Sequence, residues 1–244
     1  MQARVALYKK SWAAAATFAT EAITTSGKSL AAATEFPLIW TDESEAEVML
    51  KLKRIGTGTG NLWRDTNGDV FFEPSEKLKA QYSRTTDIRF PSYFLIGNTN
   101  GDTALIRKFF SSPRGPYIVD VKLMRVAEMY LIRAEARAEQ DDLLGASSDL
   151  NAIRAARISG YVSVPLASKT EAISEILNER FKELAYEGFR FFDLKRRGLP
   201  VSRLAADVQS ATWQTLEASS FRFTLPIPQA EIFANKNITQ NPGY

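Results

Sequence analysis

The feature that most constrains the fold is a column of three glutamates in the last third of the sequence. Glu179, Glu183 and Glu187 follow one another at intervals of four residues, so on a helix they lie on one face. Like charges at this spacing repel each other and destabilise an isolated helix. We therefore expect cations to lie against this face. The sequence offers a local supply, namely Arg180, Arg190, Lys195, Arg196 and Arg197.

Signals for helix ends flank this column. Ser168 and Glu171 have the spacing of a capping box, which predicts a helix that begins at Ser168 and runs to Glu187. Gly188 can adopt the left-handed conformation that often ends a helix. Beyond it we expect an extended arm, Phe191–Leu194, held by ion pairs. The sequence thus predicts a largely buried structural network of Glu179, Arg180, Glu183, Glu187, Arg190 and Asp193.

The same segment carries the first of three ordered motifs. Residues 179–196 read ERFKELAYEGFRFFDLKR, residues 226–235 read PIPQAEIFAN, and the chain ends in QNPGY. By these motifs the chain resembles the C-terminal signature of the SusD/RagB family, surface nutrient-binding lipoproteins of the Bacteroidetes. The motifs are structural, so they indicate the family without marking the ligand site.

The resemblance implies a function and a location. Family members bind an oligosaccharide or similar nutrient without catalysis and pass it to a SusC-like TonB-dependent transporter. They are anchored in the outer membrane through a lipidated cysteine near the mature N-terminus and face the cell surface. This chain has no cysteine, and complete members are longer. We therefore expect it to be the C-terminal half of a longer, lipid-anchored protein.

Composition fits a core-forming protein and excludes several classes of function. Of the 244 residues, 45% are hydrophobic and 24% are charged, enough for one large domain or two small ones. The net charge of +3 is slight, so we expect no nucleic-acid partner. Histidine and cysteine are absent, which removes the commonest catalytic base and the thiolate zinc site. We expect no metal or cofactor.

Two segments show helical periodicity interrupted by a turn. Residues 1–25 place small and apolar residues at helical spacing on both sides of a Lys-Lys-Ser turn, which predicts the remnant of a helical hairpin. Leu123–Arg157 repeats the pattern around the turn Asp141–Gly145. We expect it to form an antiparallel hairpin packed beside the helix that begins at Ser168. Alanine-rich faces let helices approach closely, as in tetratricopeptide-type hairpins.

The residues between these hairpins differ in composition. Residues 26–116 are rich in Gly, Thr, Asn, Asp, Pro and aromatics, although Glu47–Lys53 alternates as a strand and Ser75–Ser83 predicts a short helix. We therefore predict a mainly α fold of tetratricopeptide-like helical hairpins, with an irregular loop-rich subdomain and little β-structure. Within one SusD-like domain (1–244), we expect a hairpin remnant (1–25), a ligand-binding subdomain (26–116) and a helical region with an extended tail (117–244).

The candidate ligand contacts lie in the loop-rich region. Trp63 stands in a polar loop, where an exposed indole could stack on the apolar face of a sugar while its neighbours bond hydroxyl groups. Trp213 is a further candidate, whereas Trp40 and Tyr82 fit the core better. The predicted ligand contacts are Trp63, Asn61, Arg64, Asp65 and Tyr93.

Other chemistries fit the sequence less well. Gly56–Gly60 lacks the lysine of a phosphate-binding loop, and Asp65–Glu76 has its glycine at the wrong position for a calcium loop. A glycoside hydrolase needs a protonated carboxyl group, whereas the ordered glutamates lie among cations. Two alternatives to sugar capture stay open: a helical-repeat scaffold that binds a protein and, with less support, a glycoside hydrolase.

Overall fold

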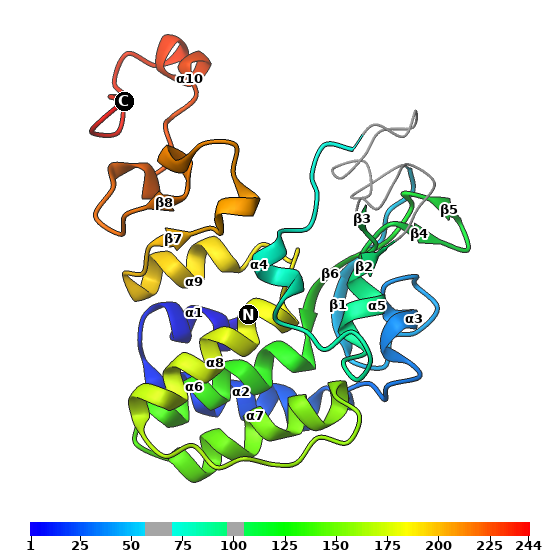
Figure 1. The fold of residues 1–244 in the computed structure, drawn as a ribbon. Coiled ribbons are helices and arrows are strands. Elements are labelled where there is room, and N and C mark those ends of the chain that lie inside the picture. Colours follow the sequence, from blue (N-terminus) through cyan, green and yellow to red (C-terminus); the bar gives the residue numbers. More distant parts are fainter. Residues whose placement is uncertain (57–69, 97–104) are drawn as a thin grey trace. The chain divides into compact units, whose positions relative to one another are not determined.

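The computed structural model describes residues 1–56, 70–96 and 105–244 (Figure 1). In these ranges the protein is mainly α-helical, and its strands are short. The mainly α fold with little β-structure is therefore confirmed. The chain divides into two compact units, Met1–Phe189 and Arg190–Tyr244.

The first helical hairpin comprises α1 (Gln2–Tyr8) and α2 (Trp12–Thr25). The turn between them contains Lys10 in a left-handed conformation (φ 58°). Both helices pack against α6 (Val126–Glu139), more than a hundred residues later in the chain. The shared core consists mainly of small side chains, which bring the helix axes close together. Its buried members are Ala3, Ala6, Leu7, Ala15, Ala19, Met129, Ile132 and Ala136.

The second hairpin comprises α6 and α7 (Leu143–Arg157), and α8 (Lys169–Glu183) packs against both. Asp142 caps α7 by accepting a hydrogen bond from Gly145 N at 2.8 Å. The predicted hairpin and its neighbour are confirmed from Val126 onward. The expectation that the helix starts at Leu123 is wrong, because residues up to Arg125 form a strand paired with β1 (Val48–Leu52).

Helix α8 begins as predicted and ends earlier than predicted. Ser168 Oγ accepts a hydrogen bond from Glu171 N at 3.2 Å, as the capping box requires. The helix ends at Glu183 instead of Glu187. The following turn has left-handed residues at Tyr186 (φ 65°) and Gly188 (φ 83°), so the chain leaves the helical path before the glycine.

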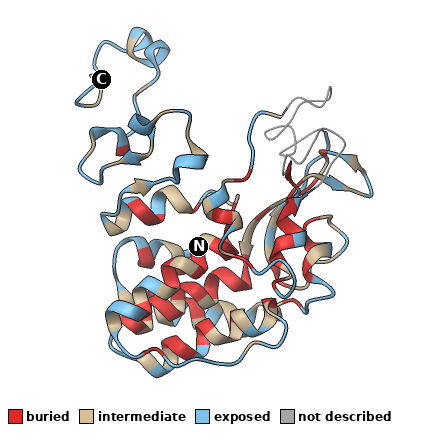
Figure 2. Ribbon diagram, viewed as in Figure 1, coloured by how far each residue is buried: buried red, intermediate tan, exposed pale blue. Residues whose placement is uncertain are grey.

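The loop-rich part of the first unit has an aromatic core. Figure 2 shows buried residues in this region as well as in the helical layer. Trp40 packs edge-on against Tyr93 with ring centroids 5.8 Å apart, and Tyr82 is also buried, so the core positions predicted for Trp40 and Tyr82 are confirmed. The helices here are α3 (Phe36–Ile39), α4 (Glu76–Lys79) and α5 (Arg89–Tyr93). The strands are β1, β2 (Phe94–Leu95), β3 (Leu105–Ile106), β4 (Ser111–Ser112), β5 (Gly115–Pro116) and β6 (Val121–Arg125).

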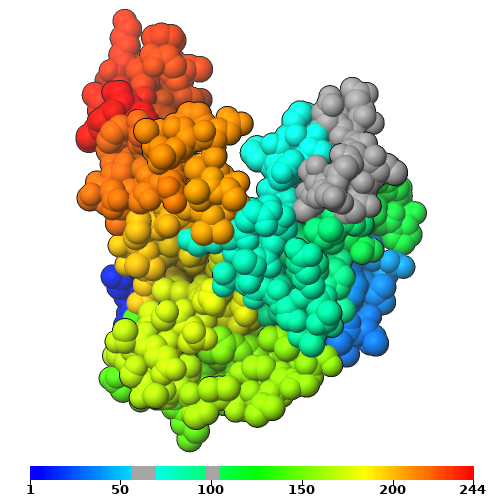
Figure 3. All heavy atoms as spheres, viewed as in Figure 1, coloured from blue at the N-terminus to red at the C-terminus, as the bar shows by residue number. Residues whose placement is uncertain are grey.

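Two local predictions in this region are confirmed. Strand β1 falls within Glu47–Lys53 and pairs antiparallel with β6, with Leu52 opposite Val121. Helix α4 starts after Ser75, whose side chain caps it by accepting from Leu78 N. Figure 3 shows the turquoise segment that contains α4 at the surface of the first unit, beside yellow-green atoms of later residues.

The second unit contains α9 (Arg190–Arg197) and short elements beyond it. The prediction of an extended arm at Phe191–Leu194 is wrong, because these residues belong to helix α9. Within this helix Asp193 pairs with Arg196, one turn later, at 2.7 Å. Near the C-terminus, the Gln240 side chain bonds both backbone groups of Ile227 at 2.8 and 2.9 Å. The remaining elements are β7 (Val201–Ser202), η2 (Ala205–Asp207), η3 (Ala211–Trp213), β8 (Thr215–Leu216), η4 (Phe221–Phe223) and α10 (Gln229–Ala234).

Candidate functional site

Four of the five predicted ligand contacts lie outside the described residues. They fall within residues 57–69 and are Asn61, Trp63, Arg64 and Asp65. Their role stays a prediction. The described chain resumes at Val70, and the next two side chains, Phe71 and Phe72, are 58% and 61% exposed. Exposed aromatic side chains therefore follow the predicted ligand loop in the sequence.

The fifth predicted contact, Tyr93, is buried in the aromatic core. Its exposed fraction is 0%, and its hydroxyl donates to the backbone oxygen of Glu183 at 3.0 Å. Burial raises the pKa of the Tyr93 phenol well above its ordinary value. The prediction of Tyr93 as a ligand contact is therefore wrong. Helix α5, which the sequence analysis did not predict, turns the ring inward.

The backbone just before the predicted ligand loop is anchored to Asp120. Arg54 N donates to Asp120 Oδ1 at 3.0 Å, and Arg54 O accepts from Arg114 Nη1 at 2.7 Å. The carboxylate also lies 3.0 Å from Lys51 Nζ and 2.6 Å from Arg114 Nη2. Burial opposes ionisation, but the hydrogen bonds from Arg54, Lys51 and Arg114 lower the pKa of Asp120 well below its usual range. These two hydrogen bonds thus hold the backbone of Arg54 in place just before the loop.

The centre of the first unit is a buried ionic network around Glu183. Its carboxylate lies 3.2 Å from Arg89 Nη1, 2.9 Å from Arg125 Nη1 and 3.1 Å from Arg157 Nη2. A second carboxylate, Glu47, also pairs with Arg125 and Arg157. All five side chains are at most 1% exposed. These pairs join the α8 helix to β6, the end of α7 and α5.

The flanking glutamates extend the network in both directions. Glu179 lies 2.5 Å from Arg89 and 2.8 Å from Arg154, while Glu187 lies 2.8 Å from Lys108. Burial alone would raise the pKa of each glutamate, but the surrounding cations lower it, in the case of Glu179 to about 2. For Lys108, burial lowers the pKa to about 8 against the opposing effect of Glu187. Carboxylates that stay ionised at neutral pH suit a structural role.

The network predicted from the sequence is found in part. Glu179, Arg180 and Glu183 are buried in the first unit, where the Glu187 side chain is 4% exposed, whereas Arg190 and Asp193 belong to the second unit. Arg89 also bonds Asp87, at 2.8 Å. The partners of the glutamates that the sequence did not indicate are Arg89, Arg125, Arg157, Arg154, Lys108 and Glu47. No local pattern marks them, because they meet the glutamates from distant parts of the chain.

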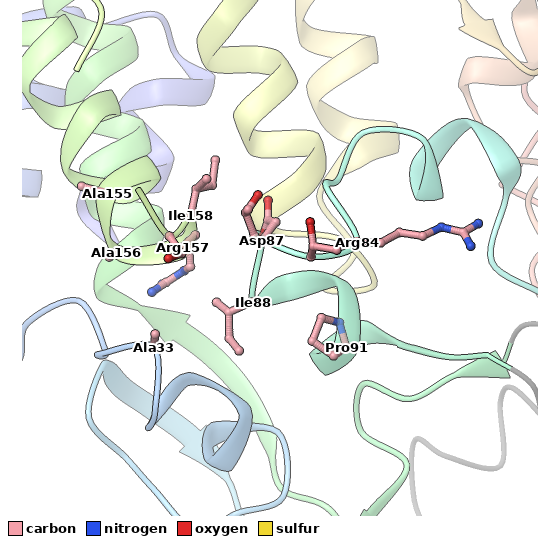
Figure 4. Close-up of a pocket in the computed structure, with 12 residues that line it drawn as sticks. Ala33, Arg84, Asp87, Ile88, Pro91, Ala155, Ala156, Arg157 and Ile158 are labelled. Atoms are coloured by element: carbon pink, nitrogen blue, oxygen red, sulfur yellow. The ribbon is translucent and has the colours of Figure 1, made fainter. Parts of the chain in front are cut away.

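A pocket of about 310 Å³ adjoins this network where α7 ends, and Asp87 and Arg157 are among its lining residues. Figure 4 shows lining residues from three segments: the loop with Ala33, the stretch from Arg84 to Pro91, and the end of α7 with Arg157. The charged groups of Asp87 and Arg157 already bond within the network. The labelled side chain of Arg84 extends away from the other lining residues (Figure 4). The pocket therefore offers few free polar groups to a ligand.

The alternative aromatic candidate, Trp213, lies in the second unit. Its side chain is 59% exposed, and its backbone oxygen accepts from Arg203 Nη1 at 3.0 Å. Of the tryptophans that the structure describes, Trp12 and Trp40 pack into cores. Trp213 therefore presents an indole to solvent and stays a candidate contact.

Neither a metal centre nor a membrane-spanning helix is found in the parts of the chain that the structure describes. Across residues 1–56, 70–96 and 105–244 no group of three or more acidic side chains is placed to hold a metal ion. In the same ranges no helix is both long enough and apolar enough to cross a membrane.

Several solved structures have a fold similar to that of this chain. A SusD superfamily protein from Bacteroides thetaiotaomicron superposes on 98% of the chain with a TM-score of 0.82 and 26% identity. The surface glycan-binding protein A of Bacteroides uniformis has a similar fold, with a TM-score of 0.73 over 98% of the chain and 19% identity. The chain covers only 58% and 59% of these two proteins.

The sequence agrees with the same group of proteins. The starch-binding protein SusD of Bacteroides thetaiotaomicron is 31% identical over 126 residues, which make up 51% of this chain and 22% of that protein. Residues 79–244 match the sequence pattern of the SusD family. This range contains all three motifs and the central glutamates of the buried network, and the chain therefore belongs to the SusD family.

Proposed function

We propose that the protein binds an oligosaccharide or related nutrient without catalysis and delivers it to a TonB-dependent outer-membrane transporter. The observation that carries the proposal is membership of a family whose relative, 31% identical over 126 residues, is a starch-binding protein. The chain covers about a fifth of that relative and somewhat over half of the structures that it resembles.

The ionised state of the network glutamates favours a binding protein over a hydrolase. A glycoside hydrolase needs one carboxyl group whose pKa is raised, so that it can protonate the leaving oxygen. The best-ordered glutamates, Glu179, Glu183 and Glu187, have lowered pKa values and bond to cations. They serve as a rigid support, on which the loop-rich part of the first unit can hold exposed side chains in place.

The proposal places the whole protein at the cell surface, held in the outer membrane by a lipid anchor. A glycan-array screen of the full-length protein is the first test, followed by calorimetric titration of each glycan that binds. We expect saturable binding of at least one oligosaccharide class and no release of reducing ends during prolonged incubation. Product formation would show a hydrolase. Absence of binding across the array, together with capture of a protein partner, would show an interaction scaffold.

Delivery to a transporter needs a separate test. We expect the affinity-tagged full-length protein to co-purify with a TonB-dependent transporter from solubilised outer membranes. Protease added to intact cells should degrade the protein if it faces outward. Protection from protease would contradict the proposed location without affecting the glycan-binding result.

A further inference from the structure

A second pocket, distinct from the predicted ligand loop, adjoins the pocket in Figure 4. It has a volume of about 340 Å³ and shares only Ile88 and Pro91 with its neighbour. Its walls come from α3, α5 and the segment around Arg107. All of its lining residues belong to the described part of the chain. The volume is within the range of small-ligand sites, which begin at about 300 Å³.

One residue that lines this pocket carries a buried hydrogen-bond donor with no acceptor in the described part of the chain. Trp40 lines the pocket and is 2% exposed, and its indole Nε1 has no hydrogen-bond partner among the described residues. A buried donor that stays unsatisfied costs roughly 1–3 kcal/mol, so such groups usually have a partner, often water or a ligand. An oxygen atom supplied from the pocket would remove this cost.

The rim carries one cation and one carboxylate with bonding capacity left over. Arg107 Nη1 donates to the backbone oxygen of Pro91 at 3.2 Å, which uses only one of its five donor hydrogens. Glu43 Oε2 accepts from the hydroxyl of Thr41 at 2.5 Å, and its other oxygen can accept further bonds. Both rim residues are exposed. A ligand that both donates and accepts hydrogen bonds, and carries no net charge, matches this pair.

The remaining lining combines apolar side chains with the hydroxyl residues Thr41, Ser92 and Ser111, and its backbone is held in place. Pro37, Leu38, Ile88 and Pro91 provide surfaces for C–H groups. Arg107 N donates to Tyr93 O at 2.8 Å, and Glu43 N donates to Leu38 O at 2.9 Å, so the backbone on both sides is fixed. Because these segments are already ordered, a ligand would lose little free energy in arranging them.

We propose that this pocket is a binding site for a single neutral pyranose unit, with its hydroxyl groups between Arg107 and Glu43 and its C–H face on the prolines. A sugar ring has a polar and an apolar part: the hydroxyl groups at its edge donate and accept hydrogen bonds, and the C–H groups on its faces make apolar contacts. A ring oxygen or hydroxyl can reach toward the Trp40 donor. The inference rests on the proposed carbohydrate binding but concerns a separate site, made entirely of described residues.

The test is nuclear magnetic resonance of the full-length protein titrated with methyl pyranosides of glucose, galactose, mannose and xylose. The indole N–H signal of Trp40 is assigned as the one lost in Trp40→Phe, a change that keeps an aromatic ring. We expect this signal to shift on addition of at least one of the four sugars. Arg107→Ala and Glu43→Gln should each weaken binding about tenfold, since each removes hydrogen bonds to a charged group.

The control is Arg84→Ala, which removes an exposed arginine that lines the neighbouring pocket. It should leave the sugar affinity unchanged, and the melting temperatures of the three surface variants should match that of the parent. No shift with any of the four sugars would overturn the proposal, and so would a shift that survives both rim substitutions. Tighter binding of methyl glucuronide than of the neutral sugars would also overturn it, because it would show an anion site. Oligosaccharide binding without these shifts would leave the proposed function standing and remove this site.

Discussion

The guanidinium of Arg89 lies 2.5 Å from the carboxylate of Glu179, ninety positions along the chain, and both side chains are completely buried. Arg89 also bonds Asp87 at 2.8 Å and Glu183 at 3.2 Å. One arginine of the short α5 helix thus joins the loop-rich part of the first unit to α8. Burying such charges is costly unless every member has its partners. The network therefore makes the position of α5 depend on α8.

Glu183→Gln should destabilise the protein sharply. The change removes the charge that compensates Arg89, Arg125 and Arg157, and loss of one partner in a buried network costs about 3–5 kcal/mol. Chemical denaturation monitored by circular dichroism measures the effect. The matched control on the same helix is Glu175→Gln, whose side chain is 40% exposed and pairs with Arg154. It should cost less than about 1 kcal/mol, and equal effects of the two changes would contradict a buried network.

Arg180→Ala should also lower stability, since Arg180 is only 1% exposed. Removal of a buried cation from this cluster is expected to cost about 3 kcal/mol or more. The preference of the protein among glycans should stay the same, because the residue is structural. A melting temperature equal to that of the parent would show that Arg180 contributes nothing to the network.

The protein should become less stable at acidic pH, because the glutamates of the network become protonated. The carboxyl of Glu179 has a pKa of about 2 in the folded protein, below its ordinary value of 4.5. Its stabilising contribution is therefore complete above pH 4.5 and is lost as the pH falls toward 2, on the order of 3 kcal/mol in total. Denaturation series at pH 6, 4 and 3 measure this loss. In Glu179→Gln the acid-dependent part should be smaller, although the variant is less stable at neutral pH.

Tyr93→Phe separates a core role from a ligand role. The change removes the hydrogen bond from the Tyr93 hydroxyl to Glu183 O and keeps the ring, so we expect a loss of about 1 kcal/mol. Glycan affinity should be unchanged, because the side chain has no exposed surface. A large loss of affinity at constant stability would restore Tyr93 as a ligand contact.

Trp63→Ala tests the predicted ligand loop. A stacked indole contributes on the order of 1–2 kcal/mol, so affinity for a glycan already shown to bind should fall about tenfold or more. Calorimetric titration of the full-length protein measures this. Phe233→Ala is a suitable control, because it removes a 78% exposed aromatic side chain of the second unit. Unchanged affinity in Trp63→Ala would direct attention to Trp213.

The sequence by itself determined the helical hairpins, the start of α8 and the family. These depend on local information: apolar spacing in residues 1–25 and 126–157, the side-chain cap at Ser168, and motifs that keep a fixed order. The glutamate column also showed that cations must lie against α8, since like charges one turn apart repel. Local rules of this kind act within a few residues and can be read from the sequence alone.

Only the tertiary structure decided which cations those are. Arg125 and Arg157 reach Glu183 from 58 and 26 positions away, and nothing near either arginine indicates the pairing. Tyr93 was misassigned for the same reason, because its burial depends on Trp40 and Phe36, which come from a distant helix and its end. The helix at residues 190–197 differs from these cases, because the Asp193–Arg196 pair that favours it is local and lies within one helical turn. Contacts between distant segments follow from the packing of whole elements, and that packing is a property of the folded chain.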